Sequence, residues 1–345
     1  LFQTTFILHP AHRTLPPIQV MSQLDQILRQ ARAIGKVMTG PKTDHPFAAA
    51  LFMIAAMAVI GVIDNYIAPL AQHIGLWQFH LTRAVVALPL VAILPLLGLG
   101  AIRPHRVWAV AVRSVLLAVS MLFYFSALAM MPIAQALAGL FTSPIFILLV
   151  SAGFMGQRIG IWRISAVALG FIGILFVLQP NPNDFDLLIL VPVCAGFFYA
   201  LSALATRTLC AGESTVAILA GMWVTLGAMG ALGSLVLALW PLWTPGDDVL
   251  FVSRPWVWPM WDAVPLVVMQ AVGSVVGVFM IIKAYQLGEP SYVSVFEYSV
   301  MIFGPLFAWV AFGQQVSALQ GIGVLCIIGA GTIIALRNRP DNVIA

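Results

Sequence analysis

The dominant pattern in this chain is a series of long apolar runs separated by short polar stretches. Each run has about 20 residues, the length that an α-helix needs to cross the hydrocarbon core of a bilayer. The stretches between them, such as Arg103-Pro104-His105-Arg106 and Gly288-Glu289-Pro290, carry charges and residues that end helices. The pattern predicts an all-α integral membrane protein with ten transmembrane helices, at residues 47–67, 77–97, 107–127, 132–153, 161–179, 187–206, 215–240, 262–284, 291–312 and 318–336.

One segment of the chain occurs twice, as residues 123–157 and 279–314. Each copy contains the end of one apolar run, a connection with a proline, a second apolar run with an internal proline, and a closing Phe-x-Gly-Gln or Phe-Gly-Gln. These prolines are Pro132 and Pro144 in the first copy and Pro290 and Pro305 in the second. We interpret the similarity as a duplication of five helices. Because five is odd, the second copy must enter from the opposite side, which predicts two inverted five-helix repeats.

Basic residues are distributed unevenly between the two ends of the predicted helices. With the N-terminus in the cytoplasm, the outer connections contain Arg254 as their one basic residue and otherwise carry aspartates. The other basic residues near helix ends then lie inside, at positions 103, 106, 158, 163, 207, 283, 337 and 339. Because Lys and Arg accumulate on the cytoplasmic side, we expect a multi-pass protein of the plasma (inner) membrane with both termini in the cytoplasm.

The predicted organisation has four parts: an N-terminal cytoplasmic tail at 1–45, a first repeat at 46–180, a second repeat at 187–337 and a C-terminal cytoplasmic tail at 338–345. In the first tail, apolar residues recur at helical spacing at Leu24, Ile27, Leu28, Ala31 and Ile34. This spacing predicts a short amphipathic helix on the membrane face, with a disordered tail as the alternative. Because the chain begins with Leu, Met21 is a candidate natural start.

The amino-acid composition and the absence of certain motifs exclude several classes of protein. With 61% hydrophobic and 8% charged residues, the chain cannot cover a globular surface with polar groups. The three cysteines form no paired pattern, which argues against disulfides and zinc, and the net charge of +4 comes without a basic patch for nucleic acid. Motifs for metalloproteases, serine hydrolases and ATP binding do not occur. We therefore expect no enzyme activity, no cofactor and no ATP hydrolysis.

The duplicated halves carry features that resemble a known family. The third helix of the first copy ends in Tyr-x-x-Ala-Leu (Tyr124 to Leu128), its counterpart ends in Ala-Tyr-x-Leu (Ala284 to Leu287), and the fourth helix of each copy bears a proline. Over about residues 47 to 337 the chain is similar to EamA-type members of the drug/metabolite transporter superfamily. In that family the fourth and ninth helices commonly close on Gly-Glu, whereas this chain has Gln157 and Gln314. The resemblance implies transport of a small organic metabolite, in either direction.

Polar residues inside the predicted spans are the candidates for function, because lipid makes each of them costly unless it faces the protein interior or water. At helical spacing they form stripes on helices of both copies, which predicts a shared polar cavity. For any single Ser, Thr or Gly, a purely structural role is the alternative. The candidate substrate-binding or coupling residues are Asp64, His80, Arg83, Arg113, Tyr124, Gln135, Tyr199, Glu297 and Tyr298.

Four of these candidates lie at matching depths in the membrane. Asp64 and Arg83 lie near the outer ends of the first and second helices, so we expect an ion pair at the outer mouth. Arg113 and Glu297 are each about six residues from the cytoplasmic end, so we expect a second pair at the inner mouth. Each pair either stabilises the structure or takes part in substrate binding or proton coupling. For Asp64 and Arg83 a further alternative is that the side chains snorkel to the lipid headgroups. Pro305, two turns after Glu297, predicts a bend beside this carboxylate.

These patterns favour a secondary transporter that works by alternating access between the repeats. A mixed cavity with aromatic, hydroxyl and charged groups suits an amino acid or a nucleoside-like compound. A proton or an exchanged metabolite is a candidate co-substrate that Glu297 would serve, and a homodimer is a candidate assembly. A passive channel or facilitator and a non-transporting membrane scaffold are the alternative functions.

Overall fold

The computed structural model describes residues 45–130, 133–157, 159–179, 188, 190–240, 251–313 and 317–337. Within these ranges ten helices are long and apolar enough to cross a membrane. They coincide with the ten predicted spans to within a few residues, which confirms the predicted fold class. The expected amphipathic helix at residues 24–34 and the C-terminal tail at 338–345 lie outside the described residues.

The first half of the chain supplies five of these spans. Their helices are α2 (Pro46–Asp64), α4 (Leu76–Ile93) with its 3₁₀ extension η1 (Leu94–Leu97), α5 (Val107–Met130), α6 (Ile133–Leu140) with α7 (Ser143–Gly153), and α8 (Ile161–Leu178). The first span stops earlier than predicted, because Asn65 turns the chain and donates from Nδ2 to the Gly61 carbonyl at 2.7 Å. A short helix, α3 (Ile67–His73), follows the turn.

The second half supplies the other five spans in the same order. Its helices are α9 (Leu190–Arg207), α10 (Thr215–Leu239), α11 (Val264–Leu287), the series α12 (Pro290–Val293), η4 (Ser294–Ser299) and α13 (Val300–Phe312), and α14 (Ala318–Arg337). Helix α10 begins at an N-cap, where the Ser214 hydroxyl accepts a hydrogen bond from the Val216 N–H. Such a cap satisfies one of the free donors at a helix start.

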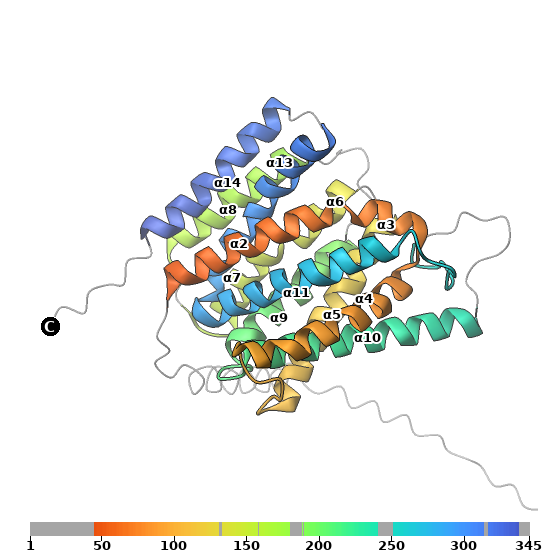
Figure 1. Ribbon diagram of the computed structural model, residues 1–345. Coiled ribbons are helices and arrows are strands. Elements are labelled where there is room, and N and C mark those ends of the chain that lie inside the picture. Colours follow the sequence, from red (N-terminus) through yellow and green to blue (C-terminus); the bar gives the residue numbers. More distant parts are fainter. Residues whose placement is uncertain are drawn as a thin grey trace, which may run out of the picture.

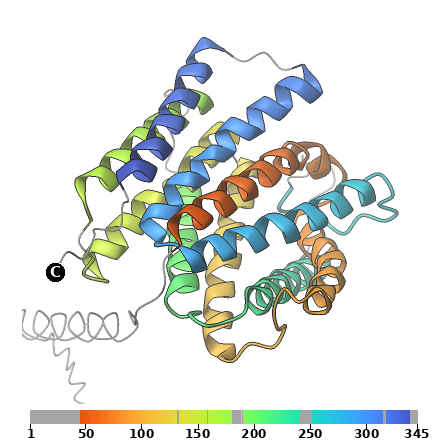
Figure 2. The same cartoon turned by 60° about the vertical axis from the view of Figure 1, so that its left-hand side comes forward.

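The packing of the spans repeats the duplication seen in the sequence. Helix α8 packs on α14 and α4 packs on α10, so the fifth span meets the tenth and the second meets the seventh. Helix α2 packs on α11 and α5 packs on α9, so the first span meets the eighth and the third meets the sixth. If each span is replaced by the corresponding span of the other half, the same set of helix pairs results. Figures 1 and 2 show α8 and α14 side by side at one edge of the bundle, and α4 and α10 at the opposite edge.

The fourth and ninth spans, which lie in the duplicated segment, are both interrupted. Between α6 and α7 the chain makes a turn at Phe141 and Thr142, and the Thr142 hydroxyl donates to the Gly139 carbonyl at 2.6 Å. In the ninth span the 3₁₀ segment η4 separates α12 from α13. The irregular segment therefore precedes Pro305, which lies inside α13, and it contains Glu297 itself. Broken helices are tolerated at membrane depth where protein or a cavity covers them.

Exposed tryptophans mark both ends of the bundle. Trp240 follows α10, and Trp258 and Trp261 precede α11; their side chains are 67–70% exposed. At the other end of the bundle, Trp108 and Trp162 are exposed at the starts of α5 and α8. Tryptophan is enriched at membrane–water interfaces. The two groups therefore mark the two interface regions of the spans.

Close contact between α8 and α14 depends on glycines. A Cβ at Gly323 would lie 2.5 Å from the Gly173 carbonyl oxygen and 2.9 Å from the Val177 backbone nitrogen, whereas a Cβ at Gly321 would meet nothing within 4 Å. We expect Gly323→Ala to lower the unfolding free energy by about 1–3 kcal/mol, the usual cost of overpacking. Gly321→Ala on the same helix is the matched control and should leave the melting temperature unchanged. Equal melting temperatures for the two variants would contradict this packing.

Candidate functional site

A central cavity lies between the two halves of the bundle. Its volume is about 160 Å³, well above the roughly 10–15 Å³ that one water molecule needs, so it has room for part of an organic molecule. Four charged side chains line it, Asp64 on α2, Arg83 on α4, Arg113 on α5 and Glu297 on η4. Both halves of the chain contribute residues to this lining.

Glu297 is held by two tyrosines of the second half. Its Oε1 accepts hydrogen bonds from the Tyr199 hydroxyl at 2.8 Å and from the Tyr285 hydroxyl at 2.6 Å. The carboxylate is buried, with 2% of its surface exposed. The direct pair with Arg113 that we expected is not formed among the described ion pairs; the Arg113 Nε instead donates to the Thr206 hydroxyl at 3.0 Å. Arg113 and Glu297 nevertheless face the same cavity.

Arg83 is held by aromatic and imidazole groups. Its guanidinium lies over the Phe79 ring at 4.4 Å and over the Trp223 ring at 5.2 Å from the centroids. Its Nη2 lies 3.4 Å from the Nδ1 of His80. The expected direct pair with Asp64 is not among the ion pairs of the described residues. Asp64 is exposed and Arg83 is buried, and the two line the same cavity.

The remaining candidates lie in different surroundings. Tyr124 lines the central cavity. His80 is buried behind Arg83, and its ring contacts Phe125 edge to face. Tyr298 is buried away from the cavity lining, against Gly170 of α8, where an added Cβ would lie 2.3 Å from its ring. The side chain of Gln135 lies outside the described part of the structure.

Tyr285 is a residue of this site whose role the sequence did not predict. Tyr285 belongs to the Ala-Tyr-x-Leu end of the eighth span, so that motif was a usable signal for it. Trp223 lies in the middle of an apolar helix, α10, where a tryptophan is typical of packing. Its place on the cavity wall depends on the rotation of that helix, which the sequence does not reveal.

The profile of the EamA-like transporter family matches residues 47–179 and 186–336, one match for each repeat. The chain belongs to the EamA-like transporter family. As an EamA-like protein it is a multi-pass membrane transporter of small metabolites and not an enzyme, as the sequence predicted.

Curated relatives of this EamA-like protein are named transporters. A riboflavin transporter from Vibrio cholerae is 28% identical over 82% of this chain and 91% of its own length. A riboflavin transporter from Rhizobium johnstonii is 28% identical over 70% of this chain and 74% of its own. An S-adenosylmethionine uptake transporter from Rickettsia felis is 23% identical over 70% and 76%. A solved crystal structure superposes on 84% of this chain and 98% of its own with a TM-score of 0.68 and 20% identity, which supports the fold.

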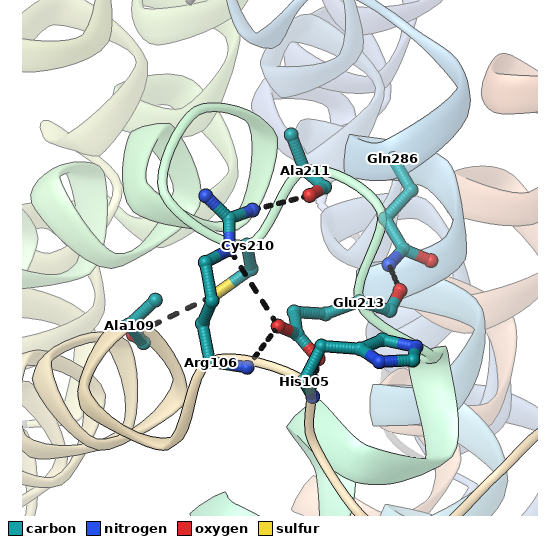
Figure 3. A network of polar contacts seen from close by, with 7 residues as sticks. All are labelled: His105, Arg106, Ala109, Cys210, Ala211, Glu213 and Gln286. Atoms are coloured by element: carbon teal, nitrogen blue, oxygen red, sulfur yellow. Dashed lines mark hydrogen bonds and ion pairs between the residues drawn. The ribbon is translucent and has the colours of Figure 1, made fainter.

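One end of the EamA-like bundle carries a dense polar network centred on Glu213 (Figure 3). Glu213 lies in the connection between α9 and α10. Its carboxylate accepts hydrogen bonds from the backbone N–H of His105 at 2.8 Å and of Arg106 at 2.6 Å, and it pairs with the Arg106 side chain at 3.7 Å. The Glu213 carbonyl accepts a hydrogen bond from Gln286 Nε2 at 2.8 Å. This network joins connections from both halves.

Cys210 lies inside the same network, outside the spanning helices. Its Sγ contacts the Ala109 carbonyl at 3.5 Å, and its side chain is fully buried. Burial disfavours the thiolate and raises the pKa of Cys210 to about 11. The thiol is therefore protonated at neutral pH and acts as a structural group.

A second pocket lies beside this network. Its volume is about 620 Å³, and its lining includes Arg207, Glu213, Lys283 and Gln286. Thr206 lines both this pocket and the central cavity. The Arg113–Thr206 hydrogen bond therefore lies where the two spaces meet.

Proposed function

We propose that this protein is a secondary, ATP-independent transporter of a small heteroaromatic metabolite of the riboflavin or nucleoside-like class. The observation that carries the proposal is the central cavity between two inverted halves, with charged and aromatic side chains from both. Such an arrangement suits alternating access, in which the halves rock around a substrate near the midplane. The riboflavin transporters among the relatives support this substrate class.

The charges of the cavity favour a substrate without net charge. Asp64 and Glu297 formally balance Arg83 and Arg113, all four of which line the cavity. Riboflavin is uncharged and combines a planar ring with a hydroxylated chain. An amino acid is zwitterionic and also fits the charge balance, but it leaves the aromatic wall unused. S-adenosylmethionine is the second candidate, carried by the uptake transporters among the relatives.

A competition panel tests the substrate class. Purified protein in liposomes would take up labelled riboflavin in the presence of excess unlabelled riboflavin, S-adenosylmethionine, a nucleoside or an amino acid. We expect riboflavin and flavin analogues to compete and the amino acid to leave uptake unchanged. Absence of specific riboflavin uptake, together with saturable uptake of labelled S-adenosylmethionine, would establish the second candidate instead.

We also propose that the Glu213 network faces the cytoplasm and that the protein resides in the plasma membrane with both termini inside. The unequal distribution of Lys and Arg supports this orientation. In a cysteine-free background, we expect Trp258→Cys to react with an impermeant maleimide in intact cells and Arg103→Cys to react only after permeabilisation. Both positions are exposed in the structure. Labelling of position 103 in intact cells would contradict this orientation and show that the connection containing residue 103 faces the outside.

A further inference from the structure

The central cavity and the second pocket lie end to end in the bundle. Both linings include Thr206 of α9, so along this helix the two spaces are separated by little more than one side chain. Along α10 the pocket lining ends at Thr215 and the cavity lining begins at Met222, roughly 10 Å away at 1.5 Å per residue. The barrier between the two spaces is therefore thinnest at Thr206.

Each space is open to solution at a different end of the bundle. The second pocket has three exposed residues in its lining, His45, Leu99 and Gly212. The central cavity has the exposed Asp64 in its lining, at the opposite end of the bundle. Toward the pocket, the lining residues Arg113 and Thr206 are only 3% and 1% exposed. The central cavity is thus closed on the side of the second pocket.

A polar contact between the two halves closes the cavity at this place. The Nε of Arg113 on α5 donates to the Thr206 hydroxyl at 3.0 Å. The Ser202 hydroxyl of α9 donates to the Arg113 carbonyl at 3.2 Å, which holds the backbone of α5 against α9. On the other side, Leu219 of α10 and Ile282 of α11 are fully buried in one apolar cluster. The side chain of Arg113 is therefore the polar and flexible part of the barrier.

Electrostatics also place Arg113 beside the second pocket. Cys210 lines that pocket, whereas Arg113 lines the central cavity. Burial is the main influence on the pKa of Cys210 and raises it, while the positive charge of Arg113 acts in the opposite direction. Since charges act strongly only at short range in solution, the guanidinium lies between the cavity and the pocket.

We propose that the second pocket is the inner part of the transport path, and that the contact between Arg113 and Thr206 is the gate between this pocket and the central cavity. This inference rests on the proposed transporter function. The substrate crosses along α9 when the Arg113 side chain leaves Thr206. An arginine side chain moves by changes of rotamer, so this gate opens without separation of the tightly packed α5 and α9.

The reaction rate of a cysteine in the central cavity tests the gate. Ser274→Cys, a near-isosteric change in the cavity lining, is made in a cysteine-free background, and a charged methanethiosulfonate is added to sealed vesicles on the side where Arg103→Cys reacts. Thr206→Val removes the acceptor of the gate, so we expect the rate at position 274 to rise about three- to tenfold, the value of one hydrogen bond. Thr208→Val is the matched control and should leave the rate unchanged, because this hydroxyl bonds the Leu204 carbonyl of its own helix and Thr208 lines neither space.

Blocking the second pocket tests the path. Lys283 lines the pocket, so a bulky maleimide attached to Lys283→Cys should reduce riboflavin uptake at least about fivefold relative to the same variant before modification. Arg103→Cys makes the same chemical change on an exposed residue at the same end of the bundle, outside the pocket lining. Its modification should leave uptake unchanged.

The outcomes separate this inference from the proposed substrate. An unchanged rate at position 274 in Thr206→Val would show that the contact is not the gate; Arg113→Met, which removes the donor, decides this point if Thr206→Val does not fold. Unchanged uptake after modification of position 283 would remove the second pocket from the path. If the unmodified protein carries no riboflavin, the proposed substrate is wrong, whereas the thiol reaction rates need no substrate and still decide the gate.

Discussion

Glu297→Gln is expected to reduce transport at least about tenfold while the protein remains folded. The amide oxygen of Gln can still accept the hydrogen bonds that Tyr199 and Tyr285 donate to Oε1, so the local packing should persist. The carboxyl group on η4 is lost, however, and with it the group that would exchange a proton or bind a donor of the substrate. Intramembrane carboxylates of this kind mark transport pathways. The measurement is the initial rate of uptake into proteoliposomes as a function of pH.

Two further variants control this experiment. Glu289→Gln makes the same chemical change at the start of α12, where Glu289 pairs with Arg163 away from the central cavity, and it should leave the rate close to that of the unmodified protein. Tyr285→Phe removes one hydrogen bond from Glu297 and keeps its carboxyl group, so we expect a smaller loss. If Glu297→Gln transports with an unchanged rate and an unchanged pH dependence, Glu297 is neither a coupling group nor a required ligand.

Glu213→Ala should lower the free energy of unfolding by about 2–4 kcal/mol, because it leaves the backbone N–H groups of His105 and Arg106 without their acceptor. Glu213 is 5% exposed, and in the folded protein its carboxylate is the acceptor of both N–H groups. The measurement is thermal unfolding in detergent, followed by tryptophan fluorescence. We expect Glu213→Ala to lower the stability of the protein without changing its affinity for substrate, since Glu213 does not line the central cavity.

Arg106→Gln is the matched comparison on the other side of the same ion pair. It removes a guanidinium whose side chain is 38% exposed and retains the Arg106 backbone donor. Exposed ion pairs contribute about 0–1 kcal/mol, so this variant should lose much less stability than Glu213→Ala. Equal losses in the two variants would show that the ion pair, and not the pair of backbone hydrogen bonds, holds the connection.

Sequence periodicity predicted the spans well and the side-chain pairs poorly. Run length fixes the number and depth of the helices, and all ten predicted spans correspond to helices of the described structure. Depth does not fix the direction in which a side chain points. Arg113 and Glu297 lie at similar depth, yet Arg113 bonds Thr206 and Glu297 bonds Tyr285, because the rotation of each helix is set by packing against its neighbours.

Adjacent residues of one stripe also separate in the structure. Glu297 and Tyr298 are consecutive, but side chains of successive residues in a 3₁₀ helix point about 120° apart. Glu297 therefore faces the cavity while Tyr298 packs on Gly170 of α8. The 3₁₀ geometry of η4, which no propensity in this segment indicated, contributes to that separation. Sequence patterns identified the polar candidates, and only the packing distinguishes those that reach the cavity.

Trans-stimulation of riboflavin flux tests alternating access through the central cavity most directly. Proteoliposomes would be loaded with unlabelled riboflavin or left empty, and the initial uptake of labelled riboflavin would be measured without ATP over a range of concentrations. Alternating access predicts uptake that saturates and that is faster into loaded vesicles, because the loaded carrier returns with substrate bound. Uptake that rises linearly with concentration and is the same in loaded and empty vesicles would contradict the carrier mechanism and indicate a passive channel.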